Sequence, residues 1–162
     1  MEMNQMMSKL MLTVLLLSVS VGSAAHNGHD HGGSEANKTV IYRQSVFKMM
    51  GWHFKAMGKM VQGRAEYDAE DFQRRAKLVH ALTQMVAEGF TPNTQDADAE
   101  TALKDEMWYQ KNRFDGLVKE LQEASSELAK LPVTADKNEL RKPLGRVART
   151  CKQCHDRFRH PL

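Results

Sequence analysis

Apolar residues recur at intervals of three and four along four segments of the chain, which is the spacing of one apolar face on an α-helix. The alternation typical of a β-strand is almost absent from this part of the sequence. The first segment carries Phe47, Met50, Phe54, Met57 and Val61. The second carries Phe72, Ala76, Val79, Thr83 and Val86. Asp68 before the second segment is a candidate N-cap, and Gly89 after it is a candidate helix stop.

The third segment is the longest, and the fourth runs almost to the C-terminus. The third carries Leu103, Met107, Gln110, Phe114, Leu117, Leu121, Ala124, Leu128 and Leu131, and it ends at Pro132. The fourth begins near Asp136 and carries Leu140, Leu144, Val147, Cys151, Cys154 and Phe158. The connectors are short, at about residues 63–67, 90–97 and 132–135. Four helices joined in this way predict an all-α fold, an antiparallel up-down-up-down four-helix bundle.

An apolar run near the N-terminus, Leu10 to Val21, stands apart from this periodic region. It is too short to span a bilayer as a helix, which needs roughly 20 residues. Lys9 precedes the run and the small residues 22–25 follow it, which predicts a cleavable signal peptide over residues 1–25. A buried N-terminal helix is the alternative. The signal peptide predicts export to the periplasm, without stable membrane insertion after cleavage.

Residues 26–37 are rich in histidine and glycine. His26, His29 and His31 fall within six positions, and such a cluster either binds a transition metal or forms a flexible N-terminal tail. The glycines favour the tail. Residues 38–162 are left for the bundle, a length that fits one domain with a single core.

The charge balance excludes some partners and leaves others open. The chain carries 23 Lys and Arg against 20 Asp and Glu, a net charge of +3, and has no basic tract interleaved with aromatic residues. Nucleic acid is therefore not an expected partner. Seven basic residues lie between Arg141 and Arg159, with Asp156 as the one acid among them. This stretch predicts either a surface for acidic partners or an ordinary solvated helix face.

The two cysteines, Cys151 and Cys154, continue the apolar face of the fourth helix and are followed directly by His155, so we expect the three side chains to converge on the core. A thioredoxin-like dithiol would place its first cysteine at a helix N-terminus, where the dipole lowers the pKa of the thiol, but this pair lies late in its helix. A structural zinc site needs four ligands, and the remaining candidates, His53 and His80, are isolated on different helices. A disulfide across so short a loop would add little stability.

Covalent haem fits all of these features. Cys-x-x-Cys-His is the attachment signature of c-type haem, in which both thiols form thioethers and the histidine binds the iron. Export agrees with this reading, because c-type haem is attached outside the cytoplasm. We therefore expect one haem c per chain, held by Cys151 and Cys154 and ligated by His155.

Three motifs extend this reading to a family. They are Tyr42-Arg43-Gln44-Ser45 in the first helix, Glu106-Met107-Trp108 in the third, and the segment from Cys151 to Arg159 in the fourth. On these motifs the chain resembles the class II c-type cytochromes, the cytochrome c prime family, over roughly residues 38–160. The resemblance implies a four-helix bundle with haem at one end and a homodimer formed through the first two helices.

The resemblance also assigns roles to individual residues. Members with methionine four residues after the first-helix arginine are six-coordinate electron carriers, whereas those with an apolar non-ligand are five-coordinate and bind nitric oxide or carbon monoxide. That position is Phe47 here, which implies a five-coordinate iron with an apolar distal side. Met50, one turn further, is the alternative internal ligand.

The family places its haem propionates near the residues that correspond to Arg43 and Gln44, and a basic residue beside the proximal pocket at Arg159. An arginine suits a bidentate contact with a carboxylate. Two functions follow: electron transfer with an acidic redox partner, and binding of a diatomic gas. We do not expect an enzyme, because no distal acid–base pair of the peroxidase kind is evident in the sequence.

Overall fold

The computed structural model of this 162-residue chain describes residues 33–90, 94–95 and 97–161, all within one compact unit, His31–Leu162. The predicted signal peptide and the three tail histidines lie outside these residues. The elements are α1 (Glu35–Val61), α2 (Ala69–Gln84), the 3-10 helix η1 (Ala87–Phe90), α3 (Glu106–Tyr109), α4 (Lys111–Lys130) and α5 (Lys137–Phe158). The described part of the chain contains no named strand, and the all-α prediction is confirmed.

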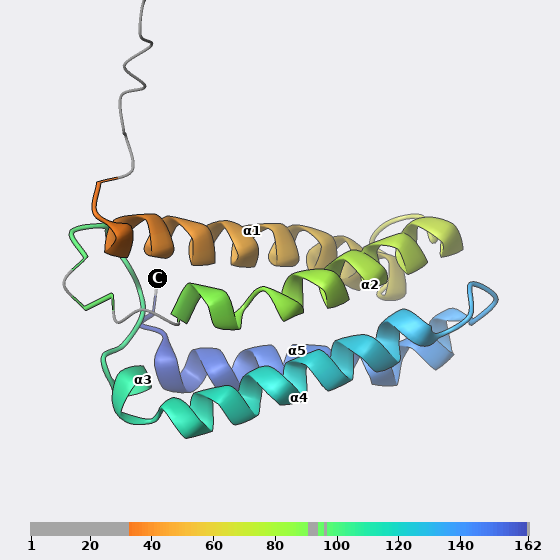
Figure 1. Cartoon of the computed structure of the whole chain (residues 1–162). Coiled ribbons are helices and arrows are strands. Elements are labelled where there is room, and N and C mark those ends of the chain that lie inside the picture. The colour runs from red at the N-terminus through yellow and green to blue at the C-terminus, as the bar shows by residue number, and fades with distance from the viewer. Residues whose placement is uncertain (1–32, 91–93, 96, 162) are drawn as a thin grey trace, which may run out of the picture. The chain divides into compact units, whose positions relative to one another are not determined.

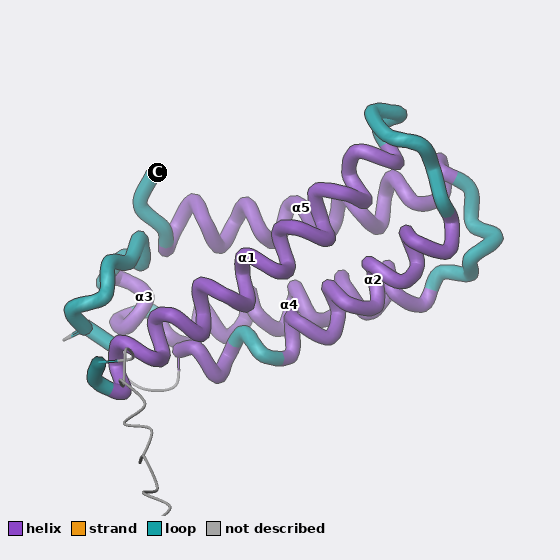
Figure 2. The backbone as a smooth tube through the Cα atoms, turned by 90° about the horizontal axis from the view of Figure 1, so that it is seen from above, coloured by secondary structure: helices purple, strands orange, loops and turns teal. Residues whose placement is uncertain are grey.

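The four long helices form the predicted antiparallel bundle. α1 packs along α2, α2 along α4, and α4 along α5, while α1 and α5 make fewer contacts and close the bundle. Figure 1 shows α1 and α2 above α4 and α5, and Figure 2 shows α5 beside α1 from above. The start of α1 and the end of α5 consequently lie at the same end of the bundle, together with α3 (Figure 1).

Side chains fix where the helices begin. Asp68 accepts a hydrogen bond from the backbone N–H of Asp71, and Asp136 forms a capping box with Glu139. Both predicted starts are confirmed. α1 begins earlier than the sequence indicated, because the side chain of Ser34 accepts from the N–H of Asn37 and makes residues 35–37 helical. No helix in the described ranges is both long and apolar enough to cross a membrane.

Two predicted helix boundaries are wrong. The third segment is not one helix from Leu103, because Gln110 (φ −121°, ψ 35°) separates the single turn of α3 from α4. Leu103 instead forms an antiparallel bridge with Arg159. Gly89 does not end α2, which stops at Gln84; it lies in η1, where a Cβ atom would approach Cβ of Arg43 to 2.5 Å.

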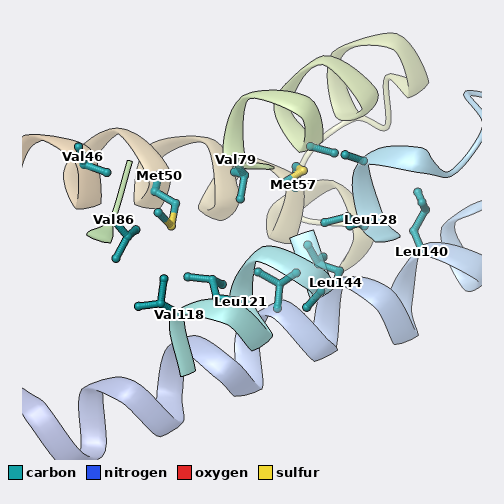
Figure 3. Packing of buried hydrophobic residues seen from close by; sticks show 14 of the residues in the cluster. Val46, Met50, Met57, Val79, Val86, Val118, Leu121, Leu128, Leu140 and Leu144 are labelled. Atoms are coloured by element: carbon teal, nitrogen blue, oxygen red, sulfur yellow. The ribbon is translucent and has the colours of Figure 1, made fainter. Parts of the chain in front are cut away.

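The core changes character along the bundle. Most of its length is filled by aliphatic side chains and methionines from all four long helices, as Figure 3 shows. Towards the end that holds the C-terminus, four phenylalanine rings follow one another in contact. The rings there are Phe47, Phe90, Phe114 and Phe158. This aromatic end lies beside the cysteines of α5.

Candidate functional site

Cys151, Cys154 and His155 lie in the last two turns of α5. The two cysteines are half-buried, one turn apart, and neither is in a disulfide. Both pack against the core, as the sequence predicted. His155, which was expected to converge on the core with them, is exposed. The helix therefore presents two sheltered thiols next to an accessible imidazole.

The electrostatics of these groups oppose dithiol redox chemistry. Burial raises the pKa of the Cys151 thiol, and burial together with the neighbouring Cys151 raises the pKa of Cys154 to about 11. Both groups therefore remain protonated thiols near neutral pH, whereas a redox-active pair needs a thiolate. Although His155 is exposed, partial desolvation and then Arg159 lower the pKa of its imidazole, with Asp156 opposing them. This favours the neutral form, which is the form that binds a metal.

A metal site built from protein ligands alone lacks support. Among residues 33–90, 94–95 and 97–161, no group of three or more His, Cys, Asp or Glu is placed to hold a metal ion. Nδ1 of His53 lies 3.4 Å from Nη1 of Arg75, and Nδ1 of His80 lies 3.1 Å from Oγ of Ser125. Both histidines are half-buried, His53 within α1 and His80 within α2, and neither joins the cysteines.

The aromatic end provides an apolar surface next to the two thiols. The ring centroids of Phe47 and Phe90 are 6.2 Å apart, those of Phe90 and Phe114 4.5 Å, and those of Phe114 and Phe158 5.9 Å. Phe158 follows Cys154 by one helical turn and is buried. Two thiols, an adjacent imidazole and a large apolar surface form a donor set and environment that fit a covalently attached haem.

Arg43 is buried at this end of the bundle, with only 4% of its surface exposed. Its guanidinium donates to Oγ1 of Thr94 at 2.6 Å and to Oγ1 of Thr101 at 2.9 Å, and its Cζ lies 5.3 Å from the centroid of Phe90. Burial lowers the pKa of Arg43. Nε2 of Gln44 donates to the carbonyl of Glu100 at 2.7 Å. The segment between η1 and α3 therefore holds both predicted propionate ligands.

Sequence reasoning missed this segment, since Thr94 and Thr101 follow no apolar periodicity. It also missed how the C-terminus is fixed. The N–H of Lys104 donates to the carbonyl of Phe158 at 2.9 Å, and the N–H of His160 to the carbonyl of Ala102 at 2.8 Å. These bonds place the half-buried Arg159, the residue predicted beside the proximal pocket, next to the loop that holds Arg43.

The remaining candidates are Met50 and Trp108. Met50 is 5% exposed and belongs to the core cluster drawn in Figure 3. Trp108 is half-buried in α3. A surface groove of about 670 Å³ runs between α4 and α5 and is lined by Arg113, Gly116, Leu117, Glu120, Gln153, Asp156 and Arg157. None of the three motif residues lines this groove, and its charged walls do not suit a large apolar group.

Known proteins are similar to this chain in both sequence and fold. The family model described as Cytochrome C' matches residues 38–159. Cytochrome c' of Halomonas halodenitrificans is 35% identical over 130 residues, which is 78% of this chain and 98% of the relative. The structure of cytochrome c prime from Shewanella frigidimarina matches with a TM-score of 0.73 and 28% identity, covering 79% of this chain and 98% of that one.

A second solved structure is a nitric oxide complex of a variant of cytochrome c prime from Alcaligenes xylosoxidans. It matches with a TM-score of 0.71 and 27% identity, and covers 80% of this chain and 98% of that one. The family model spans the four helices and the Cys-x-x-Cys-His motif together. The chain belongs to the cytochrome c' family.

Proposed function

We propose that this protein is a periplasmic haem c protein with a five-coordinate iron and an apolar distal side. It acts in electron transfer, in binding nitric oxide or carbon monoxide, or in both. A bound haem c supplies an iron centre that takes up one electron and accepts a diatomic ligand. The protein supplies the attachment, the axial ligand and the shape of the distal side.

Attachment and ligation are assigned to the end of α5. Cys151 and Cys154 form the two thioethers and His155 binds the iron, with one haem per chain. The neutral state favoured for His155 leaves a lone pair on the imidazole, which ligation requires. Arg159 lies one turn further and lowers the pKa of His155, so we assign it to the proximal side.

The observation that carries the five-coordinate proposal is Phe47. Its phenyl ring is half-buried at the edge of the aromatic end and meets Phe90 edge-on. A phenyl ring has no lone pair to donate to iron. It therefore excludes water from the distal side and does not itself become a ligand. Met50, the candidate internal ligand, is buried in the core cluster, and the Phe47 position rather than Met50 carries this proposal.

Arg43 and Gln44 are assigned to the haem propionates. The acceptors of Arg43 among the described residues are neutral hydroxyls, and a carboxylate is a stronger partner for a guanidinium than a hydroxyl. The buried charge of Arg43 therefore gains from a propionate. No acid–base pair is assigned to the distal side, and we do not propose an enzymatic activity.

Export and dimerisation complete the proposal. The signal peptide directs the chain to the periplasm. Four exposed apolar side chains lie on α1 and α2, with Trp52 the most exposed at 73%; the others are Ile41, Met49 and Leu78. Apolar surface of this kind supports a homodimer formed through the first two helices. Sedimentation analysis of the purified protein tests the dimer.

The ultraviolet–visible spectrum of the exported, dithionite-reduced protein tests the iron site. We expect a high-spin ferrous spectrum that changes when nitric oxide or carbon monoxide is added. Acidified organic solvent should extract haem from the Cys151→Ala/Cys154→Ala variant but not from the wild type. Covalent haem in that variant would refute the attachment. A low-spin ferrous spectrum unresponsive to carbon monoxide would support the alternative, a six-coordinate electron carrier with a methionine ligand.

A further inference from the structure

The positive charge of this protein is concentrated on α5. The whole chain has a net charge of only +3, yet the acids of α5 are Glu139 and Asp156 alone. Its basic residues are Lys137, Arg141, Lys142, Arg146, Arg149, Lys152 and Arg157. Five of these share the outer side of the helix, and all five are exposed. We call them the α5 basic face: Arg141, Lys142, Arg146, Arg149 and Lys152.

The α5 basic face is only partly neutralised. Arg146 pairs with Glu127 of α4, and Nζ of Lys152 lies 2.5 Å from Oδ2 of Asp156. Arg141, Lys142 and Arg149 form no ion pair with any residue in the described ranges. Three uncompensated cations therefore remain along the outside of one helix.

This arrangement differs from an ordinary solvated helix surface. Lys142 and Arg146 are four residues apart, and Arg149 is three residues from both Arg146 and Lys152. Like charges at these spacings repel one another along a helix. α4, by contrast, mixes the two signs and pairs Lys111 with Asp115. An external anionic partner would supply the counter-charges that Arg141, Lys142 and Arg149 lack within the described chain.

The face also adjoins the attachment motif. Arg149 and Lys152 flank Cys151 in the sequence, and the half-buried cysteines lie on the inner side of the same helix. A partner seated on the outer side would lie across one helix from the two cysteines that would hold the haem. The exposed large apolar residues of the described chain all lie elsewhere, so this docking surface does not overlap the exposed apolar side chains of α1 and α2.

We propose that the α5 basic face docks an acidic one-electron redox protein, an inference that rests on the proposed haem function. One electron passes from the reduced partner, which is oxidised, to the ferric iron, which becomes ferrous; no bond changes and no proton moves. A lipid surface fits less well, because the apolar side of α5 is buried in the bundle and no exposed large apolar residue lies on this helix. The face has no aromatic residue for stacking on nucleic acid bases.

The test compares two double charge reversals that change the net charge equally. Lys142→Glu/Arg149→Glu alters the face, and Lys77→Glu/Lys119→Glu alters exposed positions on α2 and α4. The probe is a flavodoxin with a net negative charge. Calorimetric titration measures its affinity for the oxidised protein at low and high salt, and stopped-flow spectroscopy measures the second-order rate of haem reduction by reduced flavodoxin.

We expect the face variant to lose about tenfold or more in both affinity and rate at low salt, and the control variant to lose less than about twofold. High salt should remove the difference, because it screens the charges. Equal losses in both variants would show an effect of net charge alone and overturn the proposal. So would an unchanged flavodoxin affinity in a face variant that no longer binds phosphatidylglycerol vesicles. A haemochrome spectrum taken beforehand reports separately whether the haem function itself holds.

Discussion

The guanidinium of Arg43 donates a 2.6 Å hydrogen bond to Oγ1 of Thr94, a residue 51 positions away in the sequence. Both residues are buried, and the bond joins the first turns of α1 to the segment that follows η1. A second bond to Thr101 joins the same side chain to the residues just before α3. One buried cation therefore organises the loop on the propionate side of the proposed site.

Thr94→Val should be more destabilising than Thr101→Val. Valine keeps the shape of threonine but removes the acceptor, which leaves part of a buried charge unsatisfied at a cost of about 1–3 kcal/mol. Thr101 is exposed, so water replaces its hydroxyl in the variant. Denaturant unfolding of both variants measures the two free energies. Equal losses of unfolding free energy would show that the buried bond to Thr94 contributes no more stability than the exposed bond to Thr101.

Gly89→Ala should destabilise the fold, whereas Gly116→Ala should not. A Cβ atom at Gly89 would lie 2.5 Å from Cβ and 3.2 Å from Cα of Arg43, so η1 has to move away from α1. We expect a loss of about 1–3 kcal/mol from this overpacking. Gly116 lies in α4 with nothing within 4 Å of its added Cβ, and alanine there should gain about 0.5–1 kcal/mol from helix propensity. Thermal unfolding compares the pair, and a Gly89→Ala protein as stable as the wild type would contradict the close approach.

Structural features that depend on residues close together in the sequence could be predicted. Asp68 and Asp136 cap helices through hydrogen bonds to residues two or three positions further, and the Cys-x-x-Cys-His motif is contiguous. Features that depend on contacts between distant parts of the chain could not be predicted. Gln110 interrupts the third segment, and Leu103 before it pairs with Arg159, 56 residues away. Thr94 and Thr101 hold Arg43 from a segment with no periodic pattern at all. The roles of Phe47, Arg43, Gln44 and Arg159 towards haem stay predictions.

The stability of the protein should fall between about pH 7.5 and pH 5.5 in a way that depends on His53. Burial, and then Arg75 and Arg74, lower the pKa of this histidine below its usual 6.5, while Asp71 opposes them. The folded protein therefore binds fewer protons than the unfolded chain in this range, so its stability is lost as pH falls. Thermal unfolding of wild type and His53→Gln at both pH values should show the wild type losing more on acidification. A parallel response of the two proteins would mean that His53 titrates alike in the folded and unfolded states.

Phe47 should control access to the proposed distal side. Its ring is in contact with Phe90 at the edge of the aromatic end, and it has to move before a ligand reaches the iron. In Phe47→Ala that barrier is removed, and each 1.4 kcal/mol removed corresponds to about a tenfold faster rate. We expect carbon monoxide to bind the ferrous variant at least about tenfold faster in flash photolysis. Leu131→Ala, a half-buried truncation at the far end of α4, is the matched control and should leave this rate unchanged.

Phe47→Met separates the two candidate functions at the same position. A thioether supplies the lone pair that the phenyl ring lacks, so the variant should shift the ferrous spectrum towards a low-spin, six-coordinate form.

The choice among diatomic gases follows from the same phenyl ring. Oxygen requires a hydrogen-bond donor to stabilise its partial negative charge, and a phenyl ring offers none, so the wild type should form no lasting oxygen complex. Nitric oxide and carbon monoxide depend far less on such a donor and should bind the wild type. If the ferrous wild type is already low-spin and Phe47→Met leaves its spectrum unchanged, another side chain occupies the iron, and the electron-carrier reading replaces gas binding.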